Sequence, residues 1–235
     1  MDQVPVKHLR PRGAALALIL ATERLIAEHG SAIVSLRQIT EAAGVANSSA
    51  VNYHFGSRET LLLAVFQYRM GDINRRRHAY VDQLVATDHS LDSRSLVGAL
   101  IHPLSEQLVP RPEGNYSIRF LERTTREGVR HIMSEIRPLM TAWMELDGLL
   151  RRTLAYLPAP VIDFRIRLMR EQAVSALASI EAMLEHEEIA RADLELHVEM
   201  VIDASLALLS GPISTKVLGL LSDAGSQDKD AAAAA

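Results

Sequence analysis

The chain has 235 residues, of which 48% are hydrophobic and 4% aromatic, and it contains no cysteine. This composition excludes a disordered chain, and the lack of cysteine excludes disulfides, zinc-thiolate sites and a thiol nucleophile. The net charge is −4, but residues 1–69 carry seven Lys and Arg against five Asp and Glu, so only the N-terminal part suits an anionic partner.

Three short helices are predicted near the N-terminus, over residues 13–29, 35–43 and 48–54. Apolar residues recur at helical spacing in the first helix, and Gly30 ends it. Ser35 is expected to cap the second helix, with Gln38 placed to complete a capping box. Gly44 suits a tight turn, and Asn47 suits the N-cap of the third helix. Helices joined by such a turn are the plan of a helix-turn-helix.

Longer helices are predicted over the rest of the chain. Ser57 is expected to cap a fourth helix that carries the apolar block Leu61–Leu63. Later helices are expected over residues 93–108, 115–131, 134–156, 161–187 and 193–210. The triplet Arg75–Arg77 is interpreted as a solvated segment just after the fourth helix, with a nucleic-acid patch as the alternative. The sequence therefore predicts an all-α fold.

Two stretches of the N-terminal region carry a specific resemblance. Residues 35–45 read SLRQITEAAGV, and residues 51–61 read VNYHFGSRETL. Together they resemble the DNA-binding domain of the TetR family of transcriptional regulators, with Tyr-His-Phe followed by Ser-Arg-Glu as the most specific part. The resemblance covers roughly residues 12–66. This sequence has one residue more in the turn than many members of the family, near Ala46.

The resemblance implies a division of the chain and a function. Residues 1–56 would form a three-helix DNA-binding domain, residues 57–72 a connecting helix, and residues 73–225 a larger helical domain for ligand binding and dimerisation. Residues 226–235 are expected to be a disordered polar or alanine tail. The expected function is a homodimeric repressor, released from a palindromic double-stranded DNA operator by a small apolar effector. The alternative is a helical small-molecule binding protein or enzyme with a vestigial helix-turn-helix.

The expected DNA contacts combine this resemblance with side-chain chemistry. Ser and Asn side chains can bond phosphates or base edges, and the amide of Asn52 suits adenine. Basic side chains suit the phosphate backbone. The candidate DNA-binding residues are Arg12, Arg37, Asn47, Ser48, Ser49, Asn52, Tyr53, His54 and Arg58. The plainer alternatives are helix caps for Asn47 and surface charges or packed rings for the arginines and His54.

The candidate ligand pocket rests on large adaptable side chains in the C-terminal domain. Trp and Met commonly line apolar pockets, although each such residue could equally be ordinary core. The candidate ligand-binding residues are Phe120, Leu121, Met140, Trp143, Met144 and Met169, and Met133 and Phe164 could join them. No buried charge cluster is evident in the sequence, which favours an apolar or weakly polar ligand.

The candidate dimer interface consists of two apolar stripes on the last two long helices. Pairs of such helices from two chains would form a four-helix bundle, with packing inside one chain as the alternative. The stripes comprise Ala173, Leu177, Ile180, Leu184, Val198, Ile202, Ser205 and Leu209.

The sequence favours a non-enzyme without a cofactor. It holds no Gly-x-Gly-x-x-Gly, P-loop, Gly-x-Ser-x-Gly or His-Glu-x-x-His motif and no obvious carboxylate pair, so no catalytic residue, cofactor or metal ligand is expected. The polar N-terminus lacks the apolar core of a signal peptide, and no stretch is long enough for a bilayer. A cytoplasmic protein with no membrane partner is therefore expected.

Overall fold

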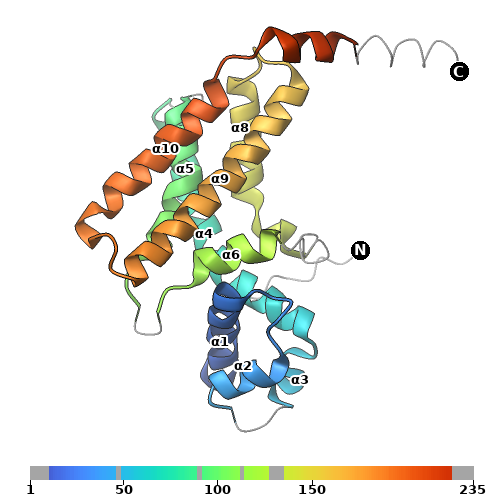
Figure 1. The fold of residues 1–235 in the computed structure, drawn as a ribbon, viewed down its shortest axis with the longest axis vertical. Coiled ribbons are helices and arrows are strands. Elements are labelled where there is room, and N and C mark those ends of the chain that lie inside the picture. The colour runs from blue at the N-terminus through green and yellow to red at the C-terminus, as the bar shows by residue number, and fades with distance from the viewer. Residues whose placement is uncertain (1–10, 46–48, 89–91, 112–113, 127–134, 224–235) are drawn as a thin grey trace, which may run out of the picture.

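The first two N-terminal helices lie within one residue of their predicted bounds, and the third begins two residues later than predicted. The computed structural model describes residues 11–45, 49–88, 92–111, 114–126 and 135–223, and within these ranges every regular element is helical, which confirms the all-α prediction. Three short helices come first: α1 (Gly13–His29), α2 (Leu36–Ala42) and α3 (Ala50–Phe55). They gather at the lower end of the molecule (Figure 1).

Helix α4 is longer than predicted and joins the two ends of the molecule. It runs from Arg58 to Ala86, past the predicted end at residue 72, and therefore includes the arginine triplet. No proline interrupts it, and buried side chains continue along one face through Met70, Ile73, Arg77 and Val81. The prediction of a solvated segment is wrong for Arg77, which is 6% exposed because it lies on this buried face.

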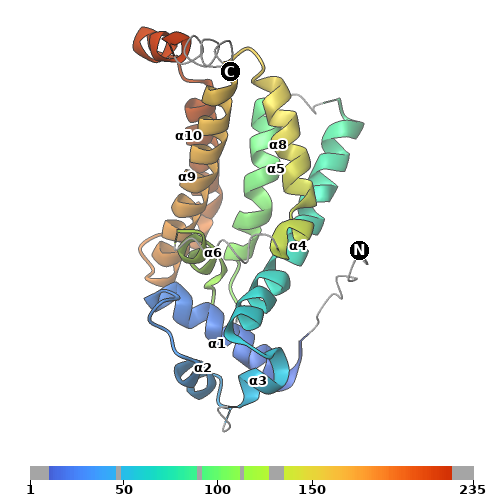
Figure 2. The same cartoon turned by 90° about the vertical axis from the view of Figure 1, so that its right-hand side faces the viewer.

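The C-terminal part is a bundle of long helices. Its elements are α5 (Ser93–Ser105), η1 (Glu106–Leu108), α6 (Ser117–Arg126), η2 (Arg137–Leu139), α8 (Thr141–Thr153), α9 (Ala159–Glu185), η3 (Arg191–Asp193) and α10 (Leu194–Ser210). Helices α9 and α10 pack against each other, and α5 lies between this pair and the pair α4 and α8 (Figure 2). A further helical segment, Thr215–Asp223, follows α10 after a bend.

Helix ends in the bundle were predicted less well than those of the N-terminal unit. The helix predicted over 134–156 is interrupted: α8 begins at Thr141, after the short turn η2 with Pro138. Helix α6 begins at Ser117, and the predicted end at 131 lies outside the described residues, as does the predicted tail. Proline removes a backbone donor and restricts the residue before it, so this break follows from local chemistry.

One apolar core runs through both parts of the molecule. Buried residues of α1 to α3 meet Leu61 and Val65 of α4, and the same helix carries the core onward through Ile73 and Val81 into the bundle. The proposed division into separate domains remains a prediction, because α4 belongs to the core on both sides of any boundary.

Neither a membrane-spanning single helix nor a metal cluster occurs in the described ranges. No single helix there combines the length and the apolar composition needed to cross a bilayer. The bent pair Arg191–Ser210 and Thr215–Asp223 meets that test jointly, by length and composition only. The same ranges contain no group of three or more His, Asp or Glu arranged to hold a metal ion.

Candidate functional site

Helices α2 and α3 are held in a helix-turn-helix by local hydrogen bonds. The Ser35 hydroxyl accepts from the Gln38 backbone N–H, and the Gln38 side chain accepts from the Ser35 N–H, which confirms the predicted capping box. After α2 the chain turns at Gly44 with φ of 65°, a conformation that suits glycine. The Val45 N–H closes this turn on the Thr40 carbonyl at 3.0 Å.

Helix α3 turns an apolar side inward and a polar side to solvent. Ala50 and Val51 are buried against the core, and Val51 has no exposed surface. The next three residues, Asn52, Tyr53 and His54, are all exposed, and the Tyr53 side chain is 85% exposed. An exposed tyrosine on a short, well-anchored helix has little packing role, so its surface is free for a partner.

The other predicted DNA contacts fall into three groups. Ser49 and Arg12 are exposed, at the starts of α3 and α1. Arg37 is also exposed and pairs with Glu41 one turn later, Nε to Oε1 at 2.8 Å. Asn47 and Ser48 lie outside the described residues. The prediction that Asn47 caps the third helix is wrong, because α3 begins at Ala50 and its N-cap is Ser49.

Arg58 makes an internal contact instead of standing free at the surface. Its guanidinium donates a hydrogen bond to the Ser31 carbonyl in the loop between α1 and α2, and its Nε is buried. Ser57 caps the same helix end by accepting from the Thr60 N–H at 3.1 Å, as predicted. Arg58 thus ties the start of α4 to the first helix pair.

A cavity of about 560 Å³ lies in the bundle, lined from α4, α5, α6, α8 and α9. Four of the six predicted ligand residues line it: Leu121, Met140, Trp143 and Met169. The other two do not: Phe120 is buried against Phe66, with ring centroids 5.1 Å apart, and Met144 is 44% exposed. Phe164 is also exposed, and Met133 lies outside the described residues.

The cavity also contains charge that the sequence did not reveal. Arg77 lines it, and burial lowers the pKa of this guanidinium to about 10. The guanidinium of Arg170 lies 5.4 Å from the centre of the Trp143 ring. The sequence had shown no buried charge cluster, and it did not reveal that Arg77 is buried in the cavity wall. The only sequence signal of this burial was the position of Arg77 on the apolar stripe of α4, four residues after Ile73 and four before Val81.

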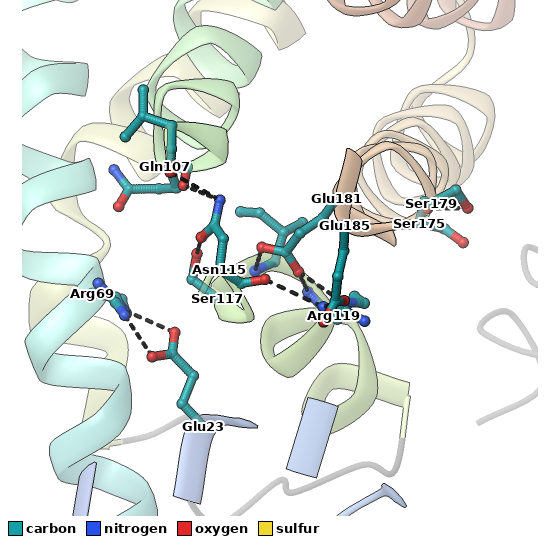
Figure 3. Close-up of polar contacts among 12 residues, drawn as sticks. Glu23, Arg69, Gln107, Asn115, Ser117, Arg119, Ser175, Ser179, Glu181 and Glu185 are labelled. Atoms are coloured by element: carbon teal, nitrogen blue, oxygen red, sulfur yellow. Dashed lines mark hydrogen bonds and ion pairs between the residues drawn. The ribbon is translucent and has the colours of Figure 1, made fainter. Parts of the chain in front are cut away.

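A buried ion pair joins α1 to α4. Arg69 binds Glu23 through two bonds, Nε to Oε1 at 2.8 Å and Nη2 to Oε2 at 2.6 Å, and both side chains are almost wholly buried (Figure 3). Two parallel bonds of this kind fix orientation as well as distance. The middle of α1 is thereby held to α4, the helix that leads into the bundle.

A second polar cluster joins α9 to the start of α6. The Glu181 carboxylate accepts from the backbone N–H groups of Ile118 and Arg119, at 3.1 and 2.9 Å, and from the Arg119 guanidinium (Figure 3). Burial raises the pKa of Glu181 to about 7, although these hydrogen bonds act in the opposite direction. Since α6 packs on α1, the cluster connects the bundle with the helix-turn-helix.

The predicted dimer residues are core residues of a single chain. All eight are buried, each at most 9% exposed, because α9 and α10 pack these stripes against each other and against their neighbours. Such side chains have almost no surface left for a partner, so their burial does not support this set as an interface. The opposite face of α10 is apolar and exposed instead, with Leu196 and Met200 at 60% and 57%.

Comparison with known proteins shows what the N-terminal part of the chain is similar to. Residues 18–65 match the family described as bacterial regulatory proteins, tetR family. The HTH-type transcriptional regulator BetI of Agrobacterium fabrum (strain C58) is 29% identical over 135 residues, which is 57% of this chain. The match spans 60% of that relative's length.

Solved structures share the arrangement of helices. A putative tetR family regulator from Shewanella sp. PV-4 superposes with a TM-score of 0.55 and 19% identity, over 84% of this chain and 96% of that one. A TetR family regulator from Marinobacter aquaeolei VT8 superposes with a TM-score of 0.51 and 19% identity, over 81% and 94%. Residues 18–65 are therefore similar to the TetR family of bacterial regulatory proteins, and the described helices share the all-α fold of the solved structures named here.

Proposed function

We propose that this chain is a cytoplasmic, homodimeric transcriptional repressor that leaves a palindromic operator when a small, largely apolar effector binds. The observation that carries the proposal is α3, which is anchored by Ala50 and Val51 and exposes Asn52, Tyr53 and His54. The relative BetI is described as a transcriptional regulator, which agrees with this reading. Nothing in the proposal calls for catalysis.

In the proposed complex α3 lies in the major groove. Asn52 would read a base edge, and Tyr53, His54 and Ser49 would contact the backbone or neighbouring bases. Arg37 and Arg12 would bind phosphates, because both are exposed and cationic. Arg58 is assigned a positioning role, since its guanidinium already bonds the Ser31 carbonyl.

A second copy would cover the exposed face of α10. Leu196, Met200, Ala204 and Ala207 follow one another at spacings of four, four and three residues, and all four are exposed. An apolar stripe of this kind on an otherwise polar surface favours association. A dimer would also supply the two copies of α3 that are needed to reach successive major grooves roughly 34–36 Å apart.

Effector binding would act through the contacts between the bundle and α1. The cavity lies between α4, α6 and α9, and two of these helices carry the buried pair at Arg69 and the cluster at Glu181. The two DNA-binding domains of the dimer would lie at different distances in two conformations. An effector that binds one of these conformations more tightly would shift the population toward that conformation.

The test is DNA binding by the purified protein. Fluorescence anisotropy with the DNA upstream of its own gene, at several salt concentrations, should give tight binding with a steep salt dependence. Asn52→Ala should relax sequence preference, and Arg37→Ala should weaken binding to all sequences and lower the salt slope by about 1. Arg152→Ala, which removes an exposed arginine of α8, is the matched control and should change neither. The vestigial alternative predicts only nonspecific affinity, about 10⁻⁴–10⁻⁶ M, for the native protein on a wide pool of DNA.

A further inference from the structure

The wall of the bundle cavity contains a cation whose charge is not neutralised by the described part of the chain. Arg77 is 6% exposed, and its Nη2 donates to the Leu100 carbonyl at 3.1 Å. Its Nε is buried without a hydrogen-bond partner in the described part of the chain, and burial lowers the pKa of the guanidinium. A buried polar N–H without a partner costs roughly 1–3 kcal/mol, and more when the group is charged.

Other arginines near the cavity are already engaged, which singles out Arg77. Arg126 pairs with Glu122 at 3.3 Å and is mostly exposed, and Arg170 lies over the Trp143 ring. On α4 itself, Arg75 and Arg76 both pair with Asp72. Arg77 is thus the buried cation of this cavity, and its Nε–H can still donate a hydrogen bond.

Most of the lining around Arg77 is apolar, although Glu122, Arg126, Arg170 and Glu171 also contribute to it, and the space is large enough for a small molecule. Phe66, Met70, Leu104, Trp143 and Met169 contribute apolar surface around Arg77. A volume of about 560 Å³ lies within the range of small-molecule sites. The lining holds three arginines and two glutamates, and Arg77 is the buried cation among them. A largely apolar cavity with such a cation on its wall is complementary to an apolar molecule that carries one negative group.

We infer that the effector is an apolar molecule with a carboxylate, and that this carboxylate binds the Arg77 guanidinium. The planar guanidinium matches a carboxylate geometrically and bonds it more strongly than it bonds a neutral acceptor. At neutral pH the guanidinium stays protonated, since its pKa of about 10 lies well above 7. This inference rests on the proposed function for its role as an effector site, whereas the binding itself does not depend on DNA.

The test compares matched carboxylates and amides on the full-length protein. Decanoate and 2-naphthoate, each beside its primary amide, are titrated by calorimetry, with decyltrimethylammonium as the cationic probe. The single tryptophan, Trp143, lines the cavity and reports occupancy by its fluorescence. We expect each carboxylate to bind at least about tenfold more tightly than its amide, because a hydrogen bond to a charged group contributes that much.

Two variants at Arg77 and one control test whether Arg77 causes the preference for carboxylates over amides. Arg77→Met should abolish the preference for carboxylates and keep the affinity for amides, since an apolar residue of similar volume is tolerated where a charge was buried. Arg75→Met, on the exposed side of the same helix, should leave the preference unchanged. If Arg77→Met does not fold, Arg77→Lys, which keeps the charge but loses the planar fork, should reduce the preference.

The outcomes separate this inference from the proposed function. Equal affinity for carboxylates and amides, a preference for the cation, no binding of either carboxylate, or an undiminished preference in the folded Arg77 variants would overturn it. Anisotropy on DNA is measured separately. If carboxylates bind through Arg77 but do not release DNA, the binding site is supported and its role as an effector site is rejected. If the protein binds DNA but no carboxylate, DNA binding is supported and the carboxylate site is rejected.

Discussion

The helix-turn-helix is specified by contacts between residues three to five apart, whereas the bundle is held by contacts between residues far apart in the sequence. In the first, Ser35 and Gln38 cap α2, and Val45 closes the turn on Thr40. In the second, Glu181 bonds the start of α6, more than sixty residues earlier. Contacts between residues close in the sequence can be predicted from the sequence pattern, whereas contacts between distant residues cannot. The structure of the helix-turn-helix is therefore predicted better than the packing of the bundle. Four experiments would break or sharpen this contrast.

The largest loss of stability is expected at the buried pair between α1 and α4. Arg69→Ala leaves the Glu23 carboxylate buried without its main partner, which should lower the free energy of unfolding by about 3–5 kcal/mol in urea denaturation. The double variant Glu23→Leu with Arg69→Met should recover most of that loss, because apolar residues replace both charges. A loss below about 1 kcal/mol in Arg69→Ala would show that the ion pair contributes little to the stability of the contact between α1 and α4.

A core residue and a surface residue of the last two helices should behave differently. Leu177 is fully buried, so Leu177→Ala should cost about 2–5 kcal/mol at any protein concentration. Met200 is 57% exposed, so Met200→Glu should leave the fold intact and instead weaken self-association, as measured by analytical ultracentrifugation. If Leu177→Ala changed only the oligomeric state, the assignment of this stripe to the core of one chain would be wrong.

The pH dependence of stability should identify Glu181. Its pKa in the folded chain is raised to about 7 by burial, so the folded state holds the proton more tightly than the unfolded state. The resulting stabilisation is complete below the unfolded pKa, near 4.5, and is lost as the pH rises through 7.

Glu181→Gln removes this titration and supplies the control. Between pH 5 and 8 the wild type should lose stability relative to this variant, by at most about 1.4 kcal/mol per pH unit. Parallel stability profiles of the two proteins would contradict the assignment.

The smallest effect is expected at the cap of α2. Ser35→Ala removes the acceptor for the Gln38 N–H and should cost about 1 kcal/mol, with a matching loss of DNA affinity if α3 depends on α2 for its position. Ser179→Ala, at an exposed site on α9, should stay within about 0.5 kcal/mol of the wild type. Equal effects of the two substitutions in thermal unfolding would show that the local cap is dispensable.

The sequence by itself determined the all-α class, the limits of α1, the cap of α2, the turn at Gly44 and the cap of α4 at Ser57. Each depends on a residue's own backbone preference or on a partner within one helical turn. It also indicated Leu121, Met140, Trp143 and Met169 for the cavity, because large adaptable side chains at helical spacing favour such a lining.

Only the tertiary structure decided which face of each long helix points inward. Helices α9 and α10 carry apolar residues on more than one face. The spacing of these residues alone therefore could not tell a buried position such as Leu177 from an exposed position such as Met200. The partners of Arg58, Arg69 and Glu181 lie 27 to 63 residues away, and Arg77 became a cavity residue only through the helices packed around it. Burial and charge pairing depend on segments that meet in space, and a linear pattern does not encode which segments meet.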